Sequence, residues 1–96
     1  MRGDRYALDT PAANGSGLSY PGKDLDKVWA QVDGTFTATI TIQGRITPSG
    51  TWVTLDTTAV PKLVELPQHV FEYRVTTSGY ATGTPTVNLC FFPRGD

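Results

Sequence analysis

The chain has 96 residues, of which 39% are hydrophobic, a size that fits one domain with a modest core. Eight basic and nine acidic residues leave a net charge of −1 without a basic stripe, so we expect no nucleic-acid partner. Cys90 is the single cysteine, which excludes an intrachain disulfide. No apolar run is long enough for a bilayer span or a signal-peptide core, so we expect neither a membrane partner nor export by a signal peptide.

Residues 1–27 differ in composition from the rest of the chain. The segment RYALDTPAANGSGLSYPGKDLDK holds two prolines, three glycines and many small residues, without sustained periodicity. This composition is typical of an irregular lead-in that becomes ordered against a partner. The sequence therefore predicts an extended N-terminal arm over residues 1–27 and a folded domain over residues 28–96.

Residues 35–46 carry the clearest secondary-structure signal. Even positions hold Phe, Ala, Ile or Gly, and odd positions hold Thr, Gln or Arg. Successive side chains of a strand point to opposite faces, so this pattern predicts a strand with one apolar face and one hydroxyl-rich face. Asp33-Gly34 just before it favours a hairpin that would pair this strand with residues 28–32.

Further strands and turns follow at short intervals. TPSG (47–50) predicts a turn with Pro48 at its first central position, followed by a return strand over 51–55. Later segments with strand character are LVEL as a short edge strand, 69–76 with Phe71, Tyr73 and Val75 on one face, and 86–92 with Val87, Leu89 and Phe91 inward. A loop is expected over 77–85. These elements predict an all-β fold, a small antiparallel β-sandwich with an irregular N-terminal arm.

Residues with catalytic or metal-binding chemistry are few and scattered. The aspartates that could serve as catalytic acids lie in the lead-in or in expected turns, where local roles are common (Asp24, Asp26, Asp33 and Asp56). One histidine, His69, and one cysteine cannot form a zinc site, and no loop has calcium-binding spacing. The glycines of GSG (15–17) do not precede a helix, so no phosphate loop is expected. We therefore expect no catalytic residue, no cofactor, no metal and no enzymatic activity.

The tryptophans leave more than one interpretation open. Trp29 is out of phase with Val28 and Ala30, so it faces outward or into an interface if the small residues face the core. Trp29 and Trp52 could pack at the rim of the core, contact a partner subunit, or form platforms for sugar rings.

Two segments resemble elements of bacteriophage virion β-sandwich proteins. QGRITPSGTWVTLD is similar to a strand, a Gly-containing turn and a Trp-bearing return strand in those chains. EYRVTTSGYATGTPTVNL is similar to their companion element, a Tyr-Arg-Val strand, a Ser/Thr/Gly/Tyr loop and a last strand. The likeness covers about residues 28–92, and it departs from the commoner form in having Thr-Pro-Ser-Gly where an Asp-Gly turn is often found.

The resemblance implies a non-enzymatic virion protein, in the first place a capsid decoration (cement) protein. It implies a homotrimer that binds the major capsid protein on the capsid surface of the virion and is located in the host cytoplasm during assembly. The arm would contribute Tyr6 and Tyr20 to the interface, the strand Trp29, and the 77–85 loop Tyr80.

Two other functions remain open. One is a phage tail or neck component, which a six-fold or twelve-fold ring would distinguish from a three-fold decoration protein. The other is a carbohydrate-binding module that uses Trp29, Trp52 or Tyr80.

Overall fold

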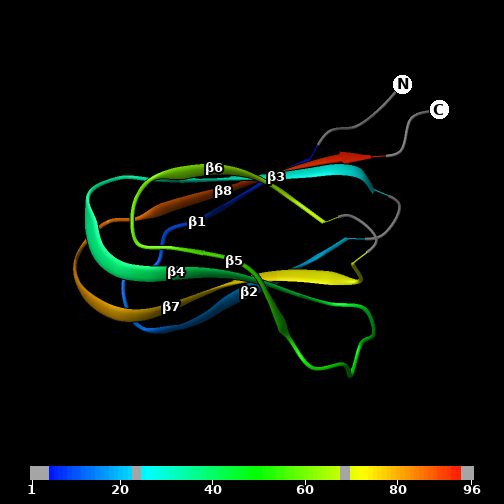
Figure 1. Cartoon of the computed structure of the whole chain (residues 1–96), viewed down its shortest axis with the longest axis horizontal. Coiled ribbons are helices and arrows are strands. Elements are labelled where there is room, and N and C mark those ends of the chain that lie inside the picture. The colour runs from blue at the N-terminus through cyan, green and yellow to red at the C-terminus, as the bar shows by residue number, and fades with distance from the viewer. Residues whose placement is uncertain (1–4, 23–24, 68–69, 94–96) are drawn as a thin grey trace.

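A computed structural model describes residues 5–22, 25–67 and 70–93, and they form two four-stranded sheets packed face to face (Figure 1). All strand pairs are antiparallel, so the expected all-β sandwich is confirmed. The strands are β1 (Arg5–Asp9), β2 (Gly15–Pro21), β3 (Leu25–Asp33), β4 (Phe36–Arg45), β5 (Val53–Thr58), β6 (Lys62–Leu66), β7 (Glu72–Gly83) and β8 (Thr86–Pro93).

The chain folds as one long antiparallel ribbon that is wrapped around the core. β4 pairs with β5, β3 with β6, β2 with β7 and β1 with β8, so the first half of the chain runs back along the second half. Wrapping then brings β8 beside β3 and β7 beside β4, which gives the sheet orders β1-β8-β3-β6 and β2-β7-β4-β5. This is the strand order of a jelly roll.

The TPSG turn lies at the tip of this ribbon. The backbone N–H of Gly50 donates to the carbonyl oxygen of Thr47 at 3.1 Å, the bond that closes a four-residue turn, with Pro48 at its first central position. The chain then returns as β5 along β4, as the sequence predicted.

The core lies between the sheets and is built from alternate positions of the central strands. The inward face predicted for residues 86–92 is confirmed, because Val87, Leu89 and Phe91 are buried. The face predicted for residues 35–46 is confirmed at Ile40 and Ile42, whereas Ile46 lies beyond the end of β4 and is 75% exposed. Buried side chains of β3, β6 and β7 complete the core (Val28, Ala30, Val32, Leu66, Tyr73 and Val75). The edge position predicted for the LVEL strand is also confirmed, since β6 ends its sheet.

The predicted boundary between an arm and a sandwich requires correction. Residues 5–9 and 15–21 lie inside the expected arm of residues 1–27, yet they form β1 and β2 at the edges of the two sheets (Figure 1). The sandwich therefore begins with β1, at Arg5, and not at residue 28. Edge strands tolerate Gly and Pro, and the inward-facing Ala7 is small, so these segments lack the usual strand composition.

The predicted hairpin at Asp33-Gly34 is wrong, because β3 and β4 lie in different sheets. Each strand already has two other neighbours, so the turn carries the chain across the sandwich instead. Gly34 adopts φ 98°, and a Cβ on it would lie 2.4 Å from the carbonyl oxygen of Thr84 in the β7–β8 connection. The backbone N–H of Thr84 donates to the carbonyl oxygen of Thr35 at 3.0 Å. This bond joins the β3–β4 connection to the β7–β8 connection, and both connections cross from one sheet to the other.

The predicted loop over 77–85 is mostly strand, because β7 continues to its end at Gly83. Its register against β4 shifts between Ser78 and Thr82, so the intervening residues form a bulge, where Gly79 has φ 61°. The abundant Thr of this segment suits a strand, and its glycine marks the irregularity.

Candidate functional site

An apolar patch covers the outer face of the β1-β8-β3-β6 sheet. Because Val28 and Ala30 point into the core, Trp29 points outward, as its phase in the sequence predicted. In the register of the sheet Cys90 lies directly between Tyr6 on β1 and Trp29 on β3. These three side chains therefore form one row across three neighbouring strands.

Leucines from the two edge strands extend this apolar surface into the next row of side chains. Leu8 is 61% exposed and Leu63 64% exposed, and both lie one row further along the same face, with Asn88 and Gln31 between them. A shallow groove of about 270 Å³ is lined by Tyr6, Trp29, Leu63 and Cys90 together with Ala30, Gln31 and Asn88. We call Tyr6, Leu8, Trp29, Leu63 and Cys90 the outer patch.

The outer patch has the character of a protein-contact surface. Tyr6 is 75% exposed, and Trp29, two strands away across Cys90, is half-buried. Contiguous exposed apolar side chains on a soluble domain mark interaction sites, and aromatic residues are enriched in them. Glu65 on β6 lies opposite Trp29, and the exposed Lys27 lies two residues before Trp29 on β3. Charge of both signs therefore borders the patch.

The opposite outer face, on the β2-β7-β4-β5 sheet, is polar and bonded within itself. The hydroxyls of Thr41 and Thr57 lie 3.0 Å apart. Gln43 Oε1 accepts hydrogen bonds from Arg74 Nε at 2.7 Å and from Thr76 Oγ1 at 3.0 Å. The hydroxyl-rich face that the alternation of residues 35–46 predicted is thus present, and its polar groups bind one another.

The Trp52 ring lies against the guanidinium groups of two arginines on this polar face. The guanidinium carbons of Arg45 and Arg74 each lie 4.4 Å from the centroid of the Trp52 ring. Arg45 Nε also donates to Glu72 Oε1 at 2.8 Å, which fixes that guanidinium in place. The Trp52 ring is therefore in contact with two guanidinium groups of the same chain.

Tyr20 and Tyr80 lie away from the outer patch. The Tyr20 ring packs on the core, 6.3 Å from the ring of Phe91, and burial raises the pKa of Tyr20, with a further rise from the negative charge of Asp9. The backbone N–H of Tyr80 donates to Asn14 Oδ1 at 2.8 Å, and its hydroxyl donates to a main-chain carbonyl within the same strand. Of the four predicted interface residues, the structure brings together Tyr6 and Trp29.

Leu8, Leu63 and Cys90 joined the site only in the structure. Leu8 shares its strand face with Tyr6, two positions away, so period-two counting could have placed it with that tyrosine. Leu63 and Cys90 meet Trp29 only through the pairing of β3 with β6 and β8, which no local pattern specifies.

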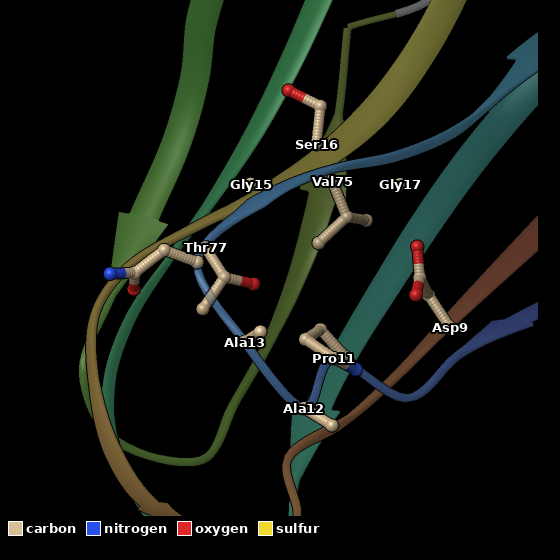
Figure 2. Close-up of a pocket in the computed structure, with 10 residues that line it drawn as sticks. Asp9, Pro11, Ala12, Ala13, Gly15, Ser16, Gly17, Val75 and Thr77 are labelled. Atoms are coloured by element: carbon tan, nitrogen blue, oxygen red, sulfur yellow. The ribbon is translucent and has the colours of Figure 1, made fainter.

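A second feature is a recess of about 230 Å³ at the edge of the sandwich, where β1 turns into β2 (Figure 2). Asp9, at the end of β1, and Val75 and Thr77 on the inner face of β7 line it, together with residues 11–17. Burial raises the pKa of the Asp9 carboxyl, and a hydrogen bond from the backbone of Thr10 offsets part of that rise.

Two other aspartates, Asp56 and Asp33, accept hydrogen bonds from nearby groups. Asp56 Oδ1 accepts from Lys62 Nζ at 2.9 Å, and Asp33 Oδ1 accepts the backbone N–H of Gly34 at 2.8 Å. Asp56 lies within β5 and not in the turn that the sequence predicted. Asp24 and His69 lie outside the described residues.

Within residues 5–22, 25–67 and 70–93, no group of three His, Cys, Asp or Glu side chains could hold a metal ion. The same residues contain no helix of the length and hydropathy that a membrane span requires. No protein-family model matches this chain, and neither a curated protein nor a solved structure matches it.

Proposed function

We propose that this chain is a structural protein of a bacteriophage virion, and specifically a decoration protein that stabilises the capsid through contacts with the major capsid protein. The observation that carries the proposal is the outer patch, an exposed aromatic surface on one sheet of a jelly roll. Jelly rolls occur in viral capsid domains, an association of fold with role that adds to the resemblance of residues 28–92.

The division of the two faces supports a contact protein. The outer patch offers Tyr6 and Trp29, which supply large contact areas at low entropic cost. On the polar face the Thr41 and Thr57 hydroxyls bond to each other and the Arg74 guanidinium binds Gln43, as suits a surface turned toward solvent. We therefore assign the outer patch to the protein interface and the polar face to the outside of the particle.

A non-enzymatic role fits the contacts of three described carboxylates, Asp33, Asp56 and Glu72. Asp56 and Glu72 are held by Lys62 and Arg45, and Asp33 binds the backbone of its own turn. Catalytic carboxylates act in facing pairs across a substrate site, whereas these lie in separate local contacts.

The oligomeric state is the first test. A decoration protein at local three-fold positions is expected to form a trimer in solution or on the shell. Light scattering on a size-exclusion column measures the mass in solution, and co-sedimentation with capsid shells measures binding. A six-fold or twelve-fold ring would favour the tail or neck alternative instead.

A pair of charge variants tests the surface. Trp29→Lys places a positive charge in the outer patch, and Thr54→Lys places the same charge on the exposed outer side of β5 in the other sheet. We expect Trp29→Lys to abolish shell binding at concentrations where Thr54→Lys binds like the unaltered chain, because unpaired charge in an apolar interface is costly. Equal binding by both variants contradicts the assignment of the patch.

A glycan array addresses the carbohydrate-binding alternative. Saturable sugar binding that disappears in Trp29→Lys, without any binding to shells, would replace the virion proposal with a carbohydrate-binding module. Absence of sugar binding, with a stable trimer or shell-bound particles, supports the decoration protein.

A further inference from the structure

The recess beside Asp9 contains a buried hydroxyl without a protein partner. Thr77 is 3% exposed and lies on the inner face of β7, in line with the core residues Tyr73 and Val75. Its Oγ1 makes no hydrogen bond with any described residue, although no fully enclosed side-chain polar atom of the described chain lacks a partner. The Thr77 oxygen therefore opens onto the recess, as Figure 2 shows.

Asp9 brings a carboxylate to the same recess, and no cationic side chain of the described residues neutralises it. Desolvation is the largest influence on the pKa of this group, and no described Lys, Arg or His lowers that pKa. A Cβ on Gly17 would lie 2.2 Å from Asp9 Oδ2, so the absence of a side chain at Gly17 gives the carboxylate its place against β2. A partly buried, unpaired negative charge attracts a cation.

The remaining walls are apolar and the space is small. Pro11, Ala12, Ala13 and Val75 contribute the apolar surface, and Figure 2 shows Pro11 between Asp9 and Thr77 in this view. A volume of about 230 Å³ is below the range of about 300–1,000 Å³ typical of sites for drug-sized ligands. The recess has room for one side chain or one small molecule, and not for an oligosaccharide or a nucleotide.

A hydrogen bond holds the wall of the recess in position. This bond involves neither the Asp9 carboxylate nor the Thr77 hydroxyl. Asn14, at the far end of the β1–β2 connection, accepts the backbone N–H of Tyr80 from the β7 bulge at 2.8 Å. This bond ties the connection to β7, so the recess is bordered by backbone that is anchored on both sides.

From these observations we infer that the recess binds a primary ammonium group carried on an unbranched apolar stem. The ammonium donates to the Asp9 carboxylate and to Thr77 Oγ1, and the stem lies along Pro11, Ala13 and Val75. A single carboxylate does not provide the six to eight oxygens of a calcium site, so a metal ion is the poorer fit. This inference is independent of the proposed virion role.

Nuclear magnetic resonance titration of the full chain tests the inference. The ligand is n-butylammonium chloride, and the matched neutral compound is n-butanol. We expect saturable shifts of the amide signals of residues 9–17 and 75–77 with roughly millimolar affinity for n-butylammonium, and weaker, non-saturating changes with n-butanol. Equal responses to the two compounds would overturn the inference.

Isosteric variants assign the contacts. Asp9→Asn is expected to weaken n-butylammonium binding at least about tenfold, and Thr77→Val several-fold, since each removes one acceptor while keeping the shape of the side chain. Asp33→Asn, which changes an exposed aspartate outside the recess, is the control and should bind like the unaltered chain. Unchanged affinity in Asp9→Asn overturns the inference, and the spectra themselves report whether each variant is folded.

The source of the ammonium group is distinguished by a third ligand, Nα-acetyl-lysine N-methylamide. Binding comparable with that of n-butylammonium supports a lysine side chain of a partner polypeptide. Binding of n-butylammonium alone supports a small free amine, because the blocked peptide groups then do not fit at the mouth of the recess. Binding of neither ammonium compound overturns the inference.

Discussion

At the scale of single residues, Tyr73 combines a buried ring with one satisfied hydroxyl. Its ring lies 5.9 Å from that of Phe91, and its hydroxyl donates to the carbonyl oxygen of Pro67 at 2.6 Å. A Cβ on Gly22 would lie 2.4 Å from the Tyr73 ring, so Gly22 allows the ring to take this position. Burial raises the pKa of Tyr73 to about 12.

Tyr73→Phe is expected to lower the free energy of unfolding at pH 7 by about 1–2 kcal/mol, because the carbonyl of Pro67 loses its donor. The folded-state pKa lies above the unfolded value of about 10, so the protonated hydroxyl contributes stability below pH 10 that is lost as the pH rises to about 12. Urea unfolding at pH 9 and pH 11 should therefore show a smaller loss for Tyr73→Phe than for the unaltered chain. Parallel losses would contradict this assignment.

Whereas the Tyr73 hydroxyl stabilises the fold at pH 7, the charged Asp9 carboxylate is expected to destabilise it. Its folded-state pKa is raised above 3.8, so its charged form is disfavoured in the fold, and stability is lost as the pH rises through that pKa. Asp9→Asn is expected to raise the urea midpoint at pH 7 and to leave it nearly unchanged at pH 3. A lower midpoint at pH 7 would show that the carboxylate has a stabilising partner. A gain in stability combined with loss of ammonium binding is the usual relation between a binding group and its fold.

At the scale of the elements, the crossing at Gly34 is the most demanding connection. A Cβ there would meet the carbonyl oxygen of Thr84 at 2.4 Å, and the backbone has φ 98°. Gly34→Ala should therefore destabilise the fold by about 2 kcal/mol or more.

Gly79→Asn is the matched control, because φ 61° is a left-handed conformation that Asn adopts and no atom lies within 4 Å of the added Cβ. We expect a cost below about 1 kcal/mol for this variant. Thermal unfolding of both variants checks the difference, and equal midpoints would show that the β3–β4 crossing yields to a side chain.

The sequence indicated which residues form the central strands and which of their faces are buried, because these depend on local alternation. It did not indicate β1, where the apolar Tyr6 and Leu8 point outward and only the small Ala7 points toward the core. It placed the Asp33-Gly34 turn but not the pairing around it, since turn chemistry is local and sheet neighbours are chosen by the whole chain.

The candidate sites show the same limit. The outward direction of Trp29 follows from its phase against Val28, but its neighbour Tyr6 reaches it only through β8. The recess combines Asp9 from the first strand with Thr77 from the seventh. Neither combination is contained in a local pattern, so these sites were accessible only after the strands had been paired.

At the scale of the whole molecule, the nested pairing makes folding depend on distant contacts. β1 pairs with β8, so the two ends of the chain must meet before the β1-β8-β3-β6 sheet is complete. Sandwiches dominated by such contacts fold in about milliseconds to seconds. We expect refolding in this range by stopped-flow tryptophan fluorescence, and microsecond folding would contradict a transition state that requires this pairing.

The pairing of β1 with β8 also makes the order of the strands cyclic. Arg5 lies opposite Phe91, and paired Cα atoms of antiparallel strands are about 5 Å apart, so a short linker can join the two ends of the chain. The chain can then be opened at the exposed tip of the ribbon, between Pro48 and Ser49. In such a circular permutant Tyr6 and Leu8 would follow Cys90 closely in sequence, so β8 and β1 would form a hairpin that carries these three members of the outer patch.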